Sequence, residues 1–183
     1  MAVPAPSRRT LITGGVRSGK SRHAELLLAS AAEVLYIAPG PVPDPVADPE
    51  WADRIALHRA RRPTHWTTHE TTDVAAAVSA STGAVLLDCL GTWVTAVIDE
   101  LDGWNRPAPD WRSDFGARTT ALTDAWAAAP GPLVAVTNEV GMGVVPAHAS
   151  GRVFRDLLGT VNQRVAEVSD DVLLVVAGRV LRL

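Results

Sequence analysis

A glycine-rich octapeptide near the amino terminus constrains this chain more than any other feature. Residues Gly14-Gly15-Val16-Arg17-Ser18-Gly19-Lys20-Ser21 match the pattern G-x-x-x-x-G-K-[ST] at every specified position. The apolar segment 10–13 before them predicts a buried strand, and residues 21–29 combine good helix formers with an apolar face. A strand, a glycine loop and a helix in this order predict a site for the phosphates of a nucleoside triphosphate.

The residue types in this motif suit a phosphate chain. Glycine lets the backbone turn so that successive N–H groups point at phosphate oxygens, and the positive end of the following helix adds to the attraction. We expect Lys20 to reach the β- and γ-phosphates and the Ser21 hydroxyl to bind Mg²⁺. The alternative is an ordinary Gly/Ser-rich turn, which the agreement of motif, flanking segments and position makes the weaker interpretation.

Length, composition and charge fit one globular domain spanning residues 1–183. The apolar runs are too short to span a membrane, and a net charge of −3 argues against a nucleic-acid-binding protein with a broad basic face. The single cysteine, Cys89, excludes an intrachain disulfide and is expected to pack as a small core residue. Residues 1–8 lack the apolar stretch of a signal peptide, so we expect a flexible leader and a cytoplasmic protein.

Apolar segments alternate with helical patterns along the rest of the chain. Strands are expected at residues 33–38, 64–68, 84–88, 133–137 and 172–176, with an edge strand at 180–183. Helices are expected from Asp48 to the segment 59–63, over residues 72–81, 92–101 and 150–169, and after Asp110. This alternation predicts a doubly wound, mainly parallel sheet in a three-layer α/β/α fold, with ligands at the carboxyl ends of the strands.

Two helices carry apolar side chains at helical spacing, and we interpret both sets as facing the core. One set follows the predicted cap Asp110 and comprises Trp111, Phe115, Leu122 and Trp126. The other lies on the helix over residues 150–169 and comprises Phe154, Leu157, Leu158, Val161 and Val165. Thr72-Asp73 is the predicted start of the alanine-rich helix before them.

Two carboxylates end predicted strands. Asp88 follows an apolar strand, where phosphate-loop proteins place an acid that holds Mg²⁺, although capping the next helix is an alternative role. Glu139 is a candidate for substrate or metal contact, and capping the turn at Gly141–Gly143 is an equal alternative. The sequence alone leaves both pairs of roles open.

His58 is the most informative of the five histidines, because Arg59, Arg61 and Arg62 follow it. One interpretation is a basic, solvated helix end that complements the helix dipole. The other is an imidazole nucleophile beside guanidinium groups that hold a triphosphate. We interpret His23 as structural, and neither the pair His65 and His69 nor the loop residue His148 predicts a metal site.

The chain lacks the Asn-Lys-x-Asp guanine signature of regulatory GTPases and the size of a motor ATPase, which favours a small phosphotransferase. Two alternatives stay open at this point. One is a simple phosphate-loop kinase of a small alcohol, in which His58 is structural. The other is a nucleotide-binding module without an acceptor substrate.

Longer motifs occur in a fixed order and carry a family resemblance. They are the phosphate loop with Arg22, Tyr36-Ile37-Ala38, Arg54-Ile55-x-x-His58-Arg59, Arg62-Pro63-x-x-Trp66, Leu86-Leu87-Asp88-Cys89, Thr137-Asn138-Glu139-Val140-Gly141-Met142-Gly143-x-Val145-Pro146 and Phe154-Arg155-Asp156-x-x-Gly159-x-x-Asn162-Gln163. Together they resemble the bifunctional adenosylcobinamide kinase/adenosylcobinamide-phosphate guanylyltransferase family of cobalamin biosynthesis. The resemblance covers residues 10–183, and the Asn138–Gly143 run and the histidine segment are its most specific parts.

The resemblance implies a RecA-like fold, a homotrimer and two reactions. The family phosphorylates the aminopropanol hydroxyl of adenosylcobinamide with ATP or GTP. It then passes GMP from GTP through a histidine to adenosylcobinamide phosphate, which gives adenosyl-GDP-cobinamide and pyrophosphate. His58 matches the guanylylated histidine, and the family's guanine-nucleotide contacts fall on Pro39, Gly40, Pro41, Arg59, Ala60, Arg61, Arg62, Glu70 and Asp88.

Because His58 must approach the α-phosphate, we expect its helix to move when GTP binds. The segment Pro39-Gly40-Pro41-Val42-Pro43-Asp44-Pro45 predicts a surface loop before this helix, and its prolines could limit the motion to a hinge. This loop is also the main departure from the family, whose members carry a Thr after Tyr-Ile-Ala and fewer prolines. Asp88 occupies a position where some members have Glu, a difference that changes the length of the side chain and not its charge.

Overall fold

The computed structural model describes residues 8–41 and 44–183, except for the side chains at positions 51, 54, 58 and 61. Within these residues seven strands form one sheet in the order β3-β2-β4-β5-β1-β6-β7. The strands are β1 (Arg9–Gly14), β2 (Val34–Ala38), β3 (Thr67–Glu70), β4 (Ala84–Asp88), β5 (Leu133–Val136), β6 (Asp171–Val176) and β7 (Arg179–Arg182). Neighbouring strands are parallel except for the pair β6 and β7, which forms an antiparallel hairpin. The mainly parallel sheet is therefore confirmed.

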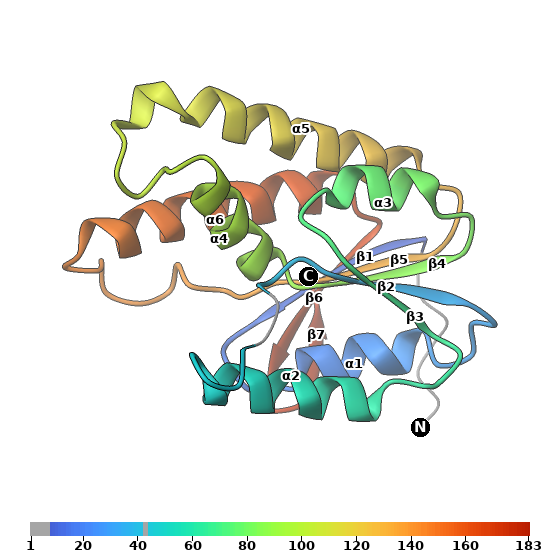
Figure 1. The fold of residues 1–183 in the computed structure, drawn as a ribbon. Helices are drawn as coiled ribbons and strands as arrows, with labels where there is room; N and C mark the ends of the chain where they lie inside the picture. The colour runs from blue at the N-terminus through green and yellow to red at the C-terminus, as the bar shows by residue number, and fades with distance from the viewer. Residues whose placement is uncertain (1–7, 42–43) are drawn as a thin grey trace.

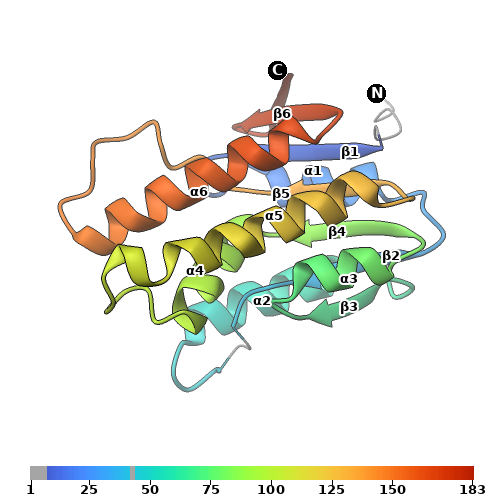
Figure 2. The ribbon, with the colours of Figure 1, turned by 90° about the horizontal axis from the view of Figure 1, so that it is seen from above.

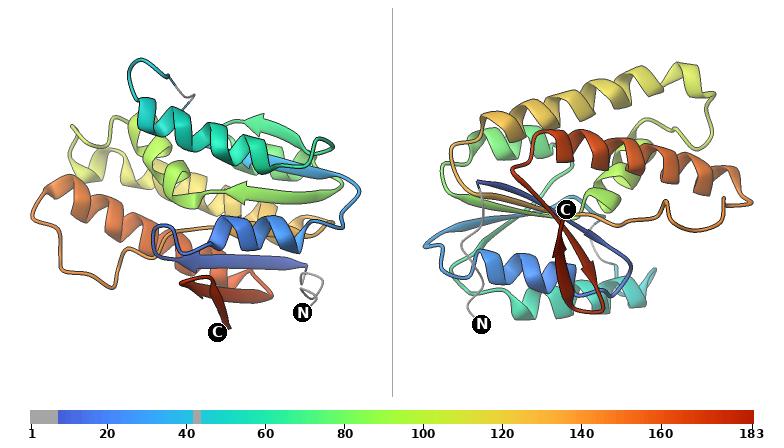
Figure 3. Two further views of the ribbon diagram at one scale, coloured as in Figure 1. Left: turned by 90° about the horizontal axis from the view of Figure 1, so that it is seen from below. Right: turned by 180° about the vertical axis from the view of Figure 1, so that it is seen from behind.

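Helices cover both faces of this sheet (Figure 1). They are α1 (Lys20–Leu27), α2 (Pro49–Arg61), α3 (Val74–Ala80), α4 (Leu90–Glu100), α5 (Arg112–Ala128) and α6 (Ala149–Glu167), with a short 3₁₀ turn η1 (Ala108–Asp110). Helices α1 and α2 lie side by side on one face, and α3 to α6 lie on the other (Figures 2 and 3). The three-layer arrangement is the predicted one. Among the described residues, no helix is long and apolar enough to cross a membrane.

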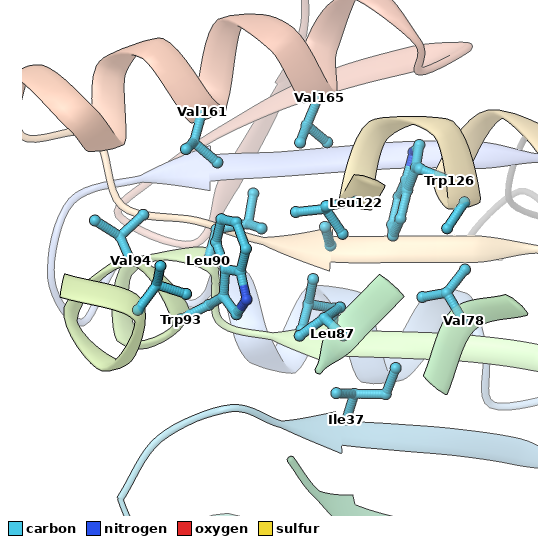
Figure 4. Close-up of a cluster of buried hydrophobic side chains, with 14 of the residues drawn as sticks. Ile37, Val78, Leu87, Leu90, Trp93, Val94, Leu122, Trp126, Val161 and Val165 are labelled. Atoms are coloured by element: carbon cyan, nitrogen blue, oxygen red, sulfur yellow. The ribbon is translucent and has the colours of Figure 1, made fainter. Parts of the chain in front are cut away.

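A separate apolar cluster fills each side of the sheet. On the α3–α6 side, Leu87 and Leu90 meet the helix residues Trp93, Trp126 and Val161 (Figure 4). The side chains predicted to form a core stripe on α5 are almost fully buried: Trp111, Phe115, Leu122 and Trp126. On the other side, α1 packs through the residues Ala24, Leu27 and Leu28. Because helices cover both faces of the sheet, the central strands consist of nearly continuous apolar runs.

The sheet brings the ends of distant strands to one edge. Strand β1 lies between β5 and β6, with Ile12 opposite Val136. Strand β5 also pairs with β4, so that Asp88 lies opposite the same Val136. Because these strands are parallel, the phosphate loop after β1 and the acid at the end of β4 share the carboxyl edge. The sheet itself thus collects the residues predicted from separate motifs.

Some predicted elements differ in the structure. The strand expected at 64–68 begins at Thr67, because Trp66 closes a turn by donating its N–H to the Pro63 carbonyl at 3.0 Å and then packs in the core. Asp110 was expected to cap α5, but it lies in η1 and Trp111 occupies the cap position. By contrast Asp73 caps α3 as predicted, since its carboxylate accepts the Ala76 N–H at 3.1 Å.

Two single residues are less buried than predicted. Phe154 on α6 was expected in the core, and instead it is half-buried and lines a cavity described below. Cys89 was expected to be a core residue, and it too is half-buried beside that cavity, although it contacts the α1-side cluster. Both lie where the sheet opens toward solvent. Leu157, Leu158, Val161 and Val165 of α6 are buried as predicted.

Candidate active site

The phosphate-loop motif forms a tight turn between β1 and α1. A Cβ added to Gly14 would lie 2.4 Å from the Val175 carbonyl oxygen, so this position accepts only glycine. Gly19 has φ 100 at the start of α1, which also favours glycine. Lys20 is 7% exposed, and its Nζ donates to the Gly15 carbonyl at 2.9 Å. The loop therefore curls around its own lysine, as a phosphate cradle requires.

Backbone hydrogen bonds hold this loop from two sides. The Glu139 N–H after β5 donates to the Gly14 carbonyl at 3.1 Å. The Gly178 N–H in the β6–β7 turn donates to the Ser18 carbonyl at 2.8 Å. The Ser18 hydroxyl is buried and has no hydrogen-bond partner among the described residues. These contacts fix the conformation of the loop.

A cavity of about 470 Å³ opens at the carboxyl ends of β2, β3, β4 and β5. Side chains and backbone from seven segments line it: Tyr36, Ala38, Gly40, Pro41, Asp44, Asp48, Ile55, Arg59, Arg62, Glu70, Asp88, Cys89, Gly91, Thr92, Thr95, Asn138 and Phe154. Six of these are nucleotide contacts predicted from the family resemblance: Gly40, Pro41, Arg59, Arg62, Glu70 and Asp88. Residues more than forty positions apart in the sequence thus meet around one space.

Three side chains form a linked group on the cavity wall. The Tyr36 hydroxyl donates to Asp88 Oδ2 at 3.0 Å, and the Arg62 guanidinium lies 3.4 Å from the centre of the Tyr36 ring. Arg62 also donates from Nη1 to the Thr68 hydroxyl at 3.1 Å. Burial, and next the charge of Asp88, raise the pKa of Tyr36 well above its usual value. The phenol therefore stays protonated and orients the carboxylate of Asp88.

Asp88 does not cap the helix that follows it. Cys89 occupies the cap position of α4, where its N–H donates to the Thr92 hydroxyl at 3.3 Å. Burial, with Asp88 as a further cause, raises the pKa of the Cys89 thiol. The capping alternative for Asp88 is thereby wrong, and its carboxylate faces the cavity.

Helix α2 is tied to the sheet near its carboxyl end. Arg59 forms an ion pair with Glu70 at the end of β3, and Arg62 stacks on Tyr36 of β2. His58 lies on the backbone of α2 one residue before Arg59, and its side chain is outside the described part of the structure, as is that of Arg61. Leu57, the residue before His58 in the chain, is 66% exposed, whereas Ile55 and Arg59 line the cavity.

The remaining predicted residues lie around the cavity without lining it. No residue of the phosphate loop lines the cavity, but the segment after β5 contacts both, because Asn138 lines the cavity and the Glu139 N–H donates to the Gly14 carbonyl. Pro39 is buried behind the cavity wall, and Ala60 is exposed on α2. Ser21 is half-buried at the start of α1. The residues predicted to bind the nucleotide thus lie in two groups, the phosphate loop and the cavity lining, and the chain after β5 connects them.

Other candidate residues have local structural roles. Glu139 Oε1 accepts the Gly141 N–H at 2.7 Å, which is the turn-capping alternative. His23 is half-buried, and burial lowers its pKa. His65 and His69 are exposed near β3, and His148 occupies the cap position of α6. No group of three or more His, Cys, Asp or Glu residues that could hold a metal occurs in the described part of the chain.

Sequence reasoning assigned no role at the site to Tyr36, Thr95 or Phe154. Tyr36 lies within the apolar run of a predicted strand, and the family motif that contains it was assigned no contact at the site. Phe154 falls in the apolar pattern of its helix, which made it look like a core residue. These three residues are recognised as part of the site because β2, α4 and α6, which carry them, border the same cavity.

Known proteins resemble this chain over most of its length. A family model described as "Cobinamide kinase / cobinamide phosphate guanyltransferase" matches residues 10–183. The chain is 44% identical over 179 residues to the "Bifunctional adenosylcobalamin biosynthesis protein CobU" of Salmonella typhimurium, a match that covers 92% of this chain and 95% of that protein. The protein of the same name from Escherichia coli is 41% identical over 177 residues, with the same coverage.

Among solved structures, a prototypical ATPase from the type III secretion system of pathogenic bacteria superimposes with a TM-score of 0.55 at 15% identity. The match covers 92% of this chain, which spans about half of that longer one, 51%. At this identity the likeness concerns the fold alone. It confirms the predicted RecA-like arrangement of a phosphate-loop protein.

Proposed function

This chain belongs to the cobinamide kinase / cobinamide phosphate guanyltransferase family, and on that premise we propose that both of its reactions use one nucleotide site, with His58 accepting GMP. As a member of the family, the chain is a bifunctional enzyme of adenosylcobalamin biosynthesis. The observation that carries the site assignment is the cavity, which gathers six residues that the resemblance assigns to guanine-nucleotide contact. Its volume of about 470 Å³ suits one nucleotide-sized ligand.

In the kinase step, the phosphate loop holds the triphosphate of ATP or GTP. The aminopropanol hydroxyl of cobinamide attacks the γ-phosphorus, a new P–O bond forms, and the bond to the β-phosphate oxygen breaks. The hydroxyl proton leaves to solvent or a base, and a nucleoside diphosphate departs. Lys20, held at the centre of the loop, neutralises the charge that grows on the bridging oxygen.

In the guanylyl transfer, His58 attacks the α-phosphorus of GTP through a neutral imidazole nitrogen. A P–N bond forms, the α–β bridging bond breaks, and pyrophosphate leaves. The phosphate of cobinamide phosphate then attacks the same phosphorus and releases the imidazole. One difficult transfer thereby becomes two easier ones. Arg59, Arg61 and Arg62 would stabilise the charge on the phosphates, since guanidinium groups pair well with phosphate oxygens.

The guanine base is best accommodated in the cavity. Gly40 and Pro41 offer backbone and a flat apolar ring on one side, and Glu70 offers a carboxylate acceptor. Guanine presents N–H donors that such a carboxylate binds. Transfer to His58 then requires α2 to swing toward the phosphate loop, which would break the Arg59–Glu70 ion pair.

Mg²⁺ fits the chemistry of Ser21 and Asp88, the two residues that the sequence predicts as its ligands. Ser21 supplies a hydroxyl at the start of α1 and Asp88 a carboxylate at the end of β4, and both are oxygen donors. Mg²⁺ typically uses one or two carboxylates together with phosphates and water, so a larger acidic cluster is not required. When bound, Mg²⁺ would neutralise charge on the transferred phosphates.

The family resemblance further supports a homotrimer and one functional domain over the chain. Sedimentation velocity at several protein concentrations tests the trimer. A sedimentation coefficient of a single chain at all concentrations would contradict it.

The experiment that tests the site uses GTP labelled at the α-phosphate, incubated with Mg²⁺ and no cobinamide. We expect protein-bound label that is labile in acid and stable in alkali, as a phosphoramidate should be. His58→Ala should abolish the label, while the matched control His65→Ala, an exposed histidine close in sequence, should keep it.

The kinase step is measured separately with γ-labelled nucleotide and cobinamide. Lys20→Ala should impair both reactions, and His58→Ala should spare the kinase step. Equal loss of both reactions in His58→Ala would contradict separate roles. Phosphorylated cobinamide without any protein-bound guanylate would leave a kinase alone.

A further inference from the structure

The loop between β5 and α6, residues 140–148, carries exposed apolar side chains at the edge of the site. Val144 is 95% exposed, Met142 81% and Val145 65%. Three large apolar side chains within four residues are more than the scattered exposure normal for a protein surface. We call them the apolar loop patch. Such a patch next to an active site usually contacts a ligand or a partner.

Hydrogen bonds to α6 and to Glu139 hold the loop backbone in place. Arg152 Nη1 donates to the carbonyls of Pro146 at 3.0 Å and Ala147 at 2.6 Å. Arg155 Nη2 donates to the Gly141 carbonyl at 2.5 Å, and Glu139 accepts the Gly141 N–H at 2.7 Å. The polar backbone is thus bound to the protein while the apolar side chains face outward. A surface that is ordered before binding loses less entropy when a ligand docks on it.

The loop is continuous with the site already described. It starts after Glu139, whose N–H holds Gly14 of the phosphate loop, and Asn138 before it lines the cavity. It ends at α6, from which Phe154 also lines the cavity. In Figure 1 the loop runs from the end of β5 outward beneath α6 and turns back into the start of α6.

The size of the acceptor substrate indicates what the patch contacts. The cavity of about 470 Å³ has room for one nucleotide-sized ligand, and the corrin of cobinamide is larger than that space can also hold. Only the aminopropanol arm needs to reach the phosphate loop. The corrin must therefore lie outside, against whatever surface borders the phosphate loop and the cavity.

We propose that the apolar loop patch is the platform on which the corrin of cobinamide rests. The corrin rim carries methyl groups, which contact valine side chains well, and Met142 can adapt to an irregular surface. The proposal rests on the assigned nucleotide site, because that site decides where the aminopropanol arm must point. It adds the acceptor subsite to that assignment.

The test is the triple variant Met142→Ser/Val144→Ser/Val145→Ser, whose sites are exposed enough that folding should not suffer. We expect the KM for cobinamide in the kinase step to rise at least about tenfold with little change in kcat. A rise of this size corresponds to the loss of a few methylene-sized apolar contacts with the substrate. The KM for the nucleotide should not change. The matched control Val176→Ser/Leu181→Ser removes exposed apolar side chains from the β6–β7 hairpin and should keep the parental KM.

Labelling with α-labelled GTP alone separates this proposal from the one on which it rests. That reaction uses no corrin, so the triple variant should take up the same amount of label as the parent. An unchanged KM for cobinamide in the triple variant would overturn the platform, even if labelling is normal. Absence of label in the parent would instead refute the assigned transferase site. A triple variant that changes sedimentation and leaves the cobinamide KM unchanged would show that the patch is an interface between copies, which also overturns the proposal.

Discussion

A buried hydrogen-bonded pair connects α6 to the chain that joins the two halves of the site. Thr137 is fully buried at the end of β5, and its hydroxyl donates to Asn162 Oδ1 at 2.6 Å. The Asn162 amide in turn donates to the Asn138 carbonyl at 3.1 Å. Asn138 lines the cavity and Glu139 holds the phosphate loop, so this pair fixes the backbone that both halves share. We expect it to matter for stability and for nucleotide binding.

The variants Asn162→Leu, Thr137→Val and their combination test this pair. Asn162→Leu leaves the buried Thr137 hydroxyl without a partner, and an unsatisfied buried group costs about 1–3 kcal/mol. The Asn138 carbonyl also loses its donor, but it lies near the cavity and can bind water, so we expect about 2–4 kcal/mol in all. Thr137→Val leaves only the half-buried amide oxygen of Asn162 without its donor, and it should lower the free energy of unfolding by about 1–2 kcal/mol.

The loss of unfolding free energy in the double variant should be smaller than the sum of the two single losses by about 1–2 kcal/mol. The reason is that the double variant removes both hydrogen-bonding groups, so that neither is left buried without its partner. The free energy of unfolding is measured by urea titration with linear extrapolation, and the affinity for GTP by calorimetry. Gln163→Ala, exposed on the same helix, is the control and should change neither. Additivity within about 0.3–0.5 kcal/mol would refute the pairing.

Three further predictions concern the site. Gly14→Ala should abolish nucleotide binding and lower the free energy of unfolding by about 2–4 kcal/mol, because the added Cβ would lie 2.4 Å from the Val175 carbonyl oxygen. Calorimetry with GTP measures the binding and urea titration measures the stability. Retained GTP binding would contradict this prediction. Burial raises the pKa of Tyr36, the single tyrosine, above its usual 10.0, so stability should be full below pH 10 and fall at higher pH, where the unfolded phenol ionises first. Absorbance titration of tyrosinate together with melting curves measures this, and Tyr36→Phe should flatten the alkaline fall. Glu70→Gln should weaken GTP binding. It should lower the free energy of unfolding by less than about 1 kcal/mol, because the ion pair of Glu70 with Arg59 is partly exposed. A large loss of stability with unchanged GTP binding would contradict a role of Glu70 in nucleotide binding.

Sequence reasoning succeeded where local chemistry decides the structure. The strand and helix that flank the glycine-rich motif, the strand at 84–88 and the Asp73 cap each follow from residue types at fixed spacing, and all three are confirmed. The parallel sheet followed from apolar strands that alternate with helices. Since parallel strands end at one edge, the nearness of Asp88 to the phosphate loop could also be expected.

Sequence reasoning failed where tertiary contacts override local signals. Asp110 has the chemistry of a cap, but a 3₁₀ turn places Trp111 there instead, and that ring is buried. Phe154 fits the apolar stripe of α6 and packs against the core cluster, yet it is only half-buried, because the part of α6 that carries it also borders the cavity. The stacking of Arg62 on Tyr36 joins a residue just after α2 to a neighbouring strand, and no sequence spacing encodes that contact.

The central claim is that the imidazole of residue 58 carries GMP between GTP and cobinamide phosphate. Its most direct test is peptide mapping by tandem mass spectrometry after GTP and Mg²⁺ are added and the protein is digested at neutral to alkaline pH. We expect guanylate on the peptide that contains His58, attached to that ring and released when cobinamide phosphate is added. Guanylate on another residue, or an adduct that cobinamide phosphate does not discharge, would contradict it.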